Sequence, residues 1–228
     1  MNQLLVAFLG GTRFRENVLG ENESVPGWQM VLGRSAWGLI TVLAAWLVRW
    51  LAPHEPFTGA LFALIAVCVI RVFVFDPKEL RVLIALSSKL ASSTTGKEGA
   101  GLFQQAIFNL LLLVRPACIF CLLLSGNALW LVAAAALGMT VACGFEDRGG
   151  KNLPKIWLAG GIVALTVGIL LARCVEHPAM LLASALAMAL CWIFPPLIGK
   201  LQIPQTKETM LYLGETLVLA VGVLGQAL

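Results

Sequence analysis

Seven apolar stretches divide this chain of 228 residues. They lie at 32–52, 57–75, 102–124, 127–144, 156–175, 178–198 and 210–228, and each is close to the roughly 20 residues that a helix needs to cross a bilayer. With 59% hydrophobic and 12% charged residues, the chain has too little polar surface to cover a soluble globule. The sequence therefore predicts an all-α, polytopic integral membrane helical bundle of about seven transmembrane helices, with 1–228 as a single domain.

The basic residues fall on alternate connections between these stretches. They are Arg13, Arg15 and Arg34 in the N-terminal segment, Lys78, Arg81, Lys89 and Lys97 in the second connection, Arg148, Lys151 and Lys155 in the fourth, and Lys200 and Lys207 in the sixth. By the positive-inside rule these connections are cytoplasmic. We therefore expect a multi-pass protein of a bacterial-type inner membrane, with a cytoplasmic N-terminal segment at 1–31 and the C-terminus outside. This bias accounts for the net charge of +4, so the expected partner is the lipid bilayer and not nucleic acid.

The longest cytoplasmic connection, at 76–101, contains a helix-start pattern. It opens with Asp76-Pro77-Lys78-Glu79, in which Asp caps the helix and Pro takes the first helical position. An apolar face follows, formed by Leu80, Leu83, Ile84, Leu86 and Leu90. The pattern predicts a short helix that lies on the inner membrane surface.

Ionisable residues inside the apolar stretches are costly and by default mark a site. Arg115 lies near the middle of the third stretch, directly before Pro116, and Glu215 lies about two turns inside the last one. An Arg115–Glu215 ion pair facing the bundle interior would neutralise both charges. Three further arginines lie near stretch ends and can snorkel toward nearby acids, as Arg49 to Glu55, Arg71 to Asp76 and Arg173 to Glu176.

Glu208 and Glu215 are seven residues apart at the start of the last stretch. Two helical turns would place both carboxylates on one face. With Asp76, they could hold a divalent metal through oxygen ligands. The alternative is that Thr206 caps the helix and Glu208 offsets its dipole.

The run Gln205-Thr206-Lys207-Glu208-Thr209, followed by Glu215, resembles the closing motif of the membrane-bound adenosylcobinamide-GDP ribazoletransferases, the cobalamin phosphate synthases. Thr12-Arg13, Gly96 and Arg115 fall in a similar order. The resemblance implies transfer of a phosphorylated cobinamide from its GDP anhydride to a ribazole, with loss of GMP. It also implies catalytic Glu208 and Glu215, Mg²⁺ on Glu208, Glu215 and Asp76, and phosphate binding by Arg13, Lys97 and Lys200.

The chain departs from that family in one respect, because it has only two aspartates, Asp76 and Asp147, where the family has a cluster of three. Catalysis has therefore been rebuilt on glutamates or lost. A non-catalytic membrane subunit is one alternative, and its partner face would be the small-residue stripe of Gly160, Ala164, Gly168 and Ala172. A small-solute permease is another, in which Pro116 and Pro195-Pro196 would break two helices at a binding site.

Overall fold

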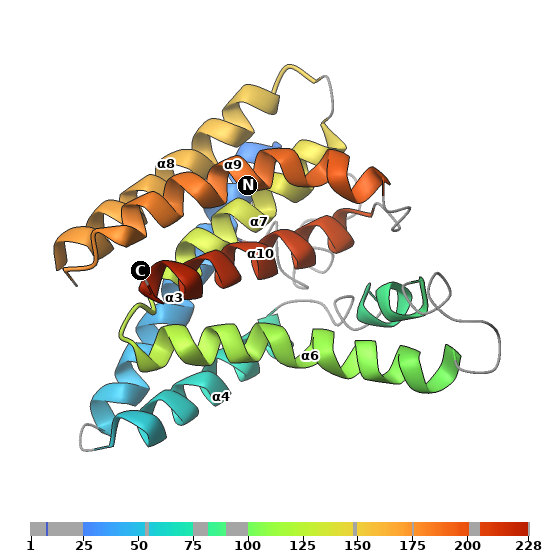
Figure 1. The fold of residues 1–228 in the computed structure, drawn as a ribbon. Coiled ribbons are helices and arrows are strands. Elements are labelled where there is room, and N and C mark those ends of the chain that lie inside the picture. Colours follow the sequence, from blue (N-terminus) through green and yellow to red (C-terminus); the bar gives the residue numbers. More distant parts are fainter. Residues whose placement is uncertain are drawn as a thin grey trace.

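The computed structural model describes residue 8 and residues 25–52, 55–74, 82–89, 100–147, 150–174, 176–200 and 206–227, and no strand occurs among them. A helix lies on each of the seven predicted apolar stretches (Figure 1). The helices are α3 (Gly27–Leu51), α4 (Pro56–Val74), α6 (Ala100–Leu124), α7 (Trp130–Glu146), α8 (Leu153–Cys174), α9 (Ala179–Lys200) and α10 (Lys207–Ala227). The all-α prediction is thus confirmed for the described part of the chain.

Five of these helices are long and apolar enough to cross a membrane. They are α3, α6 from Gln104, α8, α9 as far as Ile198, and α10. The apolar parts of α4 (Pro56–Arg71) and α7 (Trp130–Glu146) are shorter. The chain is therefore a multi-pass helical membrane protein. That the two shorter helices, α4 and α7, also cross the membrane stays a prediction.

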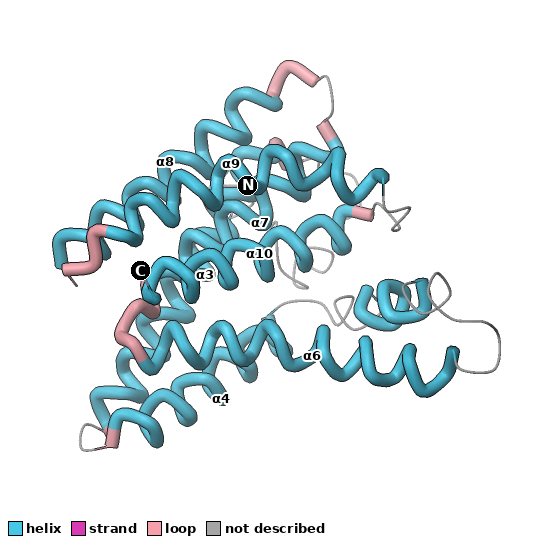
Figure 2. Tube along the Cα trace, in the orientation of Figure 1, coloured by secondary structure: helices cyan, strands magenta, loops and turns pink. Residues whose placement is uncertain are grey.

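Helices α3, α7 and α10 form the centre of the bundle, with the pair α8 and α9 on one side and the pair α4 and α6 on the other (Figures 1 and 2). Helix α7 packs against α3, α8, α9 and α10, whereas α4 packs chiefly against α3 and α6. Every residue of α7 from Trp130 to Gly144, except Ala135, is buried. Helix α7 carries no polar face because it is surrounded by other helices, in agreement with its apolar sequence.

Helices α7 and α10 approach each other closely at small residues. A side-chain carbon added at Gly138 of α7 would collide with the side chain of Glu215 and would lie 3.0 Å from its backbone nitrogen. Further along the pair, the indole nitrogen of Trp130 donates a hydrogen bond to the carbonyl of Val218 at 2.7 Å, and Gly222 leaves room for that indole. Small residues are what permit such close backbone contact between membrane helices.

The small-residue stripe of α8 serves internal packing. Gly160 lies against Thr140 of α7, Gly168 lies against Ser184 of α9, and a side-chain carbon at either glycine would collide with the hydroxyl. Ala164 is fully buried. Three of the four predicted partner-face residues are therefore covered by this chain itself, and the prediction that the stripe binds a partner is wrong for them.

The prolines do not interrupt the helices that contain them. Helix α6 continues through Pro116, and α9 continues through Pro195 and Pro196. The discontinuous helices expected for a permease are therefore not formed at these prolines.

A helix lies at residues 82–89, within the connection where the sequence predicts an interfacial helix. Val82, Leu83 and Leu86 are buried, whereas Ile84 is 51% exposed. The predicted start of this helix at Asp76 to Glu79 lies outside the described residues. The connection therefore holds a helix that buries Leu83 and Leu86 of the predicted apolar face but not Ile84, and its location on the membrane surface stays a prediction.

Helix α3 begins earlier than its apolar stretch predicted. Helix α3 starts at Gly27, and Arg34 lies within it, buried to 2% exposure. Phe8 also reaches this helix, because the Trp37 indole donates to its carbonyl at 3.0 Å and the two rings stack with centroids 4.7 Å apart. The assignment of Arg34 to the cytoplasmic N-terminal segment was therefore wrong.

Candidate functional site

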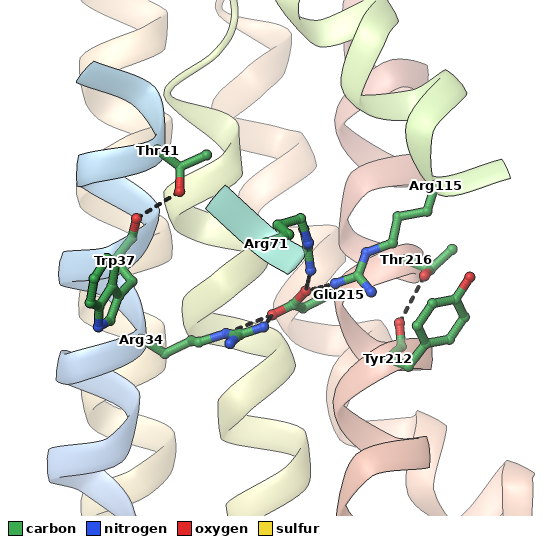
Figure 3. A network of polar contacts seen from close by, with 8 residues as sticks. All are labelled: Arg34, Trp37, Thr41, Arg71, Arg115, Tyr212, Glu215 and Thr216. Carbon is green, nitrogen blue, oxygen red and sulfur yellow. Dashed lines mark hydrogen bonds and ion pairs between the residues drawn. The ribbon is translucent and has the colours of Figure 1, made fainter. Parts of the chain in front are cut away.

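A cluster of charged side chains lies inside the bundle around Glu215, which we call the arginine cluster and which consists of Glu215, Arg34, Arg71 and Arg115 (Figure 3). Glu215 is two turns inside α10 and 2% exposed. Each arginine comes from a different helix, Arg34 from α3, Arg71 from α4 and Arg115 from α6. A buried carboxylate requires charged or hydrogen-bonded partners, because an uncompensated charge is costly away from bulk water.

The two carboxylate oxygens of Glu215 are shared among the three guanidinium groups. Arg34 donates to Oε1 from Nε at 3.1 Å and from Nη2 at 2.9 Å. Arg71 donates to Oε2 from Nη2 at 2.5 Å, and Arg115 forms an ion pair with the same oxygen. The carboxylate thereby joins α10 to three other helices through charge-assisted contacts, which are about twice as strong as neutral hydrogen bonds.

The guanidinium of Arg115 is also positioned by an aromatic ring. It lies 4.9 Å from the ring centroid of Tyr212 on α10, which is within the range of a cation–π contact. The Tyr212 hydroxyl donates to the carbonyl of Leu111 on α6 at 2.8 Å. These contacts hold α6 against α10 at Arg115 and one turn before it.

The three arginines differ in exposure. The side chains of Arg34 and Arg115 are 2% and 6% exposed, whereas that of Arg71 is 19% exposed. A cavity of about 30 Å³ lies beside the cluster, with Arg34, Arg71, Thr41 and Glu215 in its wall. It can hold one or two water molecules. Arg71 is therefore the most exposed arginine of the cluster.

The structure confirms the predicted contact of one arginine and differs from the sequence prediction for two others. Arg115 and Glu215 form the expected ion pair. Arg71 was expected to snorkel toward Asp76, but its guanidinium reaches inward to Glu215. Arg34 was not expected at the site at all. The sequence feature that could have indicated this role is the mostly apolar run from Trp28 to Leu32, which extends α3 toward the N-terminus and so places Arg34 within the helix.

The described residues do not fit the Mg²⁺ site that the sequence predicted. Glu208 lies two turns before Glu215 on α10, which is roughly 10 Å along the helix axis, and both oxygens of Glu215 contact guanidinium groups. Three positive charges at this carboxylate oppose a divalent cation. Among the residues that the structure describes, no three His, Cys, Asp or Glu side chains come together, and Asp76 lies outside them.

The predicted phosphate-binding residues are not brought to the cluster by any described contact. Arg13 and Lys97 lie outside the described residues. Lys200 is the last residue of α9, and its side chain is not described. The alternative role for Thr206 is confirmed, because its hydroxyl accepts a hydrogen bond from the backbone N–H of Thr209 at 3.2 Å and so caps α10.

A second ion pair joins α7 and α10 at the ends of these helices. Lys207 donates to Glu146 at 2.5 Å, and their side chains are 25% and 50% exposed. The two residues line an open cavity of about 500 Å³ together with Met30, Cys143 and Asp147. Lys207, which belongs to the run that resembles the family's closing motif, is therefore paired with Glu146 at the start of α10.

No family model, no curated protein and no solved structure matches this chain. The resemblance to the ribazoletransferases thus rests on the short motifs around Glu208 and Glu215.

Proposed function

We propose that this membrane protein binds a phosphate-bearing ligand at the arginine cluster. The observation that carries the proposal is the convergence of three guanidinium groups from three helices on one buried carboxylate. Guanidinium groups are also the side chains that bind phosphate with two parallel hydrogen bonds.

Entry of the ligand involves Arg71 and α4. The cavity beside the cluster, at about 30 Å³, holds water but not a phosphate group. Arg71 is the most exposed of the three arginines, and it lies in the last turn of α4, whose contacts are chiefly with α3 and α6. A phosphate would replace the carboxylate of Glu215 at Arg71, which exchanges one charge-assisted contact for another. Arg34 and Arg115 would keep Glu215 neutralised.

The finer proposal is that the ligand is a nucleotide-activated cobinamide and that the protein acts as a ribazoletransferase. In that reaction a ribazole hydroxyl oxygen attacks the phosphorus attached to cobinamide, the bond to the GMP oxygen breaks, and the hydroxyl proton is released. Guanidinium groups would stabilise the negative charge that spreads over the phosphate oxygens. The closing motif at Gln205 to Glu215 supports this choice of substrate.

A second candidate function is that of a non-catalytic membrane subunit, for which the cluster is purely structural. It is favoured by the engagement of both Glu215 oxygens and by the poor fit of the described residues to a metal. In this case the cluster holds α3, α4, α6 and α10 together, and partners bind elsewhere. The two candidates differ in whether an added anion competes with Glu215.

Ligand binding by purified protein in lipid nanodiscs separates these candidates. Calorimetric titration with GDP should show binding that is lost in Arg71→Gln and kept in Arg173→Gln, a variant at an exposed arginine in the last turn of α8. GMP release from adenosylcobinamide-GDP and ribazole phosphate, measured with and without Mg²⁺, should depend on Arg71 in the same way. Binding without release would leave a phosphate-binding protein without the transferase activity. Absence of GDP binding in folded protein would overturn the proposal in favour of the structural role.

Orientation belongs to the same proposal. We expect seven spans in an inner membrane, with the connection at 145–155 in the cytoplasm and the C-terminus outside, because the basic residues favour this arrangement at all four inner segments. Cysteine-accessibility labelling at Lys151 and at the C-terminus measures it directly. Labelling of both positions from the same side would rule out seven spans.

A further inference from the structure

A groove on the outer surface, between α3 and α8, has a polar end and an apolar body. Its volume is about 440 Å³, and its wall includes Trp28 and Leu32 of α3 and Lys155, Leu158 and Ile162 of α8. Leu158 and Ile162 are 63% and 56% exposed, so they face the surroundings of the bundle. Both helices are long and apolar enough to span a membrane, and the groove therefore opens toward lipid.

The polar end of the groove lies where both helices begin. Trp28 is in the first turn of α3 and Lys155 is in the first turn of α8. The two helix starts are adjacent, because a side-chain carbon added at Gly27 would lie 2.7 Å from the Ile156 side chain. From Lys155 the apolar wall extends along α8 to Val163, which is roughly 12 Å at 1.5 Å per residue. The groove thus has its charge at the membrane surface and its apolar wall at the depth of acyl chains.

The geometry points to a binding site for an anionic phospholipid in this groove. An acyl chain would lie along Leu32, Leu158 and Ile162, and the lipid phosphate would contact the Lys155 ammonium. Trp28 suits the headgroup level, where tryptophan is enriched. Within the described part of the chain Lys155 forms no ion pair, so its charge is available to the phosphate. Basic residues at the end of a groove between membrane helices are a known basis for recognition of anionic lipids.

The occupant is assigned by charge complementarity. A zwitterionic lipid would fill the apolar wall equally well, but its cationic headgroup would offset the attraction of the phosphate to Lys155. Near a membrane surface one basic residue contributes about 1 kcal/mol to binding of anionic lipid, which is about a fivefold preference. This inference uses other residues than the arginine cluster and does not depend on the proposed function.

Native mass spectrometry of the purified protein with an equimolar mixture of phosphatidylglycerol and phosphatidylcholine tests the assignment. The parent protein should retain phosphatidylglycerol preferentially. Lys155→Gln should lower this preference about fivefold, which is the ratio given by one surface charge. Lys151→Gln is the matched control, because this exposed lysine belongs to the same basic connection but is absent from the groove wall. It should leave most of the preference in place.

A second variant separates the groove from the general charge of the connection. Ala159 lies in the groove wall, and Ala159→Phe should fill the groove and reduce retention of both lipids while Lys155 is kept. The helical circular dichroism of each variant shows that it is folded. Equal effects of Lys155→Gln and Lys151→Gln, or unchanged retention in folded Ala159→Phe, would overturn the proposal, since lipid would then be attracted by the connection as a whole.

Discussion

The ion pairs of α10 use the same chemistry in opposite surroundings. At the start of α10, Lys207 pairs with Glu146, and the carboxylate side chain is 50% exposed. Two turns further along, Glu215 pairs with arginines and is 2% exposed. The first pair keeps solvent as an alternative partner, whereas in the second the guanidinium groups of Arg34, Arg71 and Arg115 contact the carboxylate (Figure 3).

This difference shows that the effect of breaking an ion pair on the free energy of unfolding depends on whether solvent can compensate the separated charges. An exposed pair that separates is solvated at once, and such pairs contribute about 0.2–1 kcal/mol. When one partner of a buried pair is removed, the remaining charge stays without compensation, which costs about 3–5 kcal/mol. The net contribution of the intact buried pair is smaller than this, because both partners were desolvated when the protein folded.

The largest expected effect is that of Glu215→Leu. It leaves three guanidinium groups around an apolar side chain, and we expect it to lower the free energy of unfolding by about 3–5 kcal/mol. Thermal unfolding in detergent, followed by circular dichroism, measures the loss. Glu208→Leu, two turns earlier on the same helix and partly exposed, should cost less than about 0.5 kcal/mol. Similar losses in both variants would show that burial does not distinguish the two glutamates.

Arg34→Met is expected to cost about 1.5–3 kcal/mol, the range for hydrogen bonds to charged groups, because Arg34 makes two of the contacts to Glu215. The sign of its effect should reverse when it is combined with Glu215→Leu. In that background Arg34 is an uncompensated buried charge, so its replacement by methionine should stabilise the protein. A double-mutant cycle measured by thermal unfolding tests this. Additive effects of the two substitutions would contradict direct coupling.

Gly138→Ala tests whether the position of Glu215 depends on the close contact between α7 and α10. The added methyl group would collide with the Glu215 side chain, and we expect a loss of about 1–3 kcal/mol, as for other overpacked sites. Gly161→Ala is the control, because the added carbon would meet only the flexible Met188 sulfur at 3.4 Å. Alanine is also the better helix former, so the control should be neutral or slightly stabilising. Equal destabilisation by both substitutions would exclude a specific role of the contact at Glu215.

The smallest effect is expected for the exposed pair. The coupling between Lys207→Gln and Glu146→Gln in a double-mutant cycle should be about 0.2–1 kcal/mol at low salt. It should fall toward zero near 1 M salt, where the Debye length is about 3 Å. The coupling between Arg34 and Glu215 should change little over the same range, because buried charges are screened much less. Equal salt dependence of the two couplings would show that solvent reaches the arginine cluster.

Much of the fold could be predicted from composition and spacing. A helix lies on each of the seven apolar stretches. The bilayer core offers no water to the backbone polar groups, and a helix satisfies them within one segment. The pairing of Arg115 with Glu215 was also predictable, because these two charges lie farthest from the stretch ends. Arg71 was misjudged, since its position near the end of a stretch is compatible with snorkelling and with inward pairing alike. The arginines around Glu215 could not be predicted from spacing either, because helical spacing places Glu208 and Glu215 on one face but does not indicate what faces them.

The sequence by itself determined the helices of this protein, their membrane character and the need for partners of its intramembrane charges, because hydrophobicity and hydrogen-bonding requirements act on each segment separately. Only the tertiary structure decided that arginines of α3, α4 and α6 share one carboxylate of α10, and that Gly160 and Gly168 of α8 face inward. The physical reason is that contacts between helices depend on how side chains of distant segments fit together. In lipid, where apolar surfaces gain little by meeting one another, close packing at small residues and polar contacts select the neighbours of each helix.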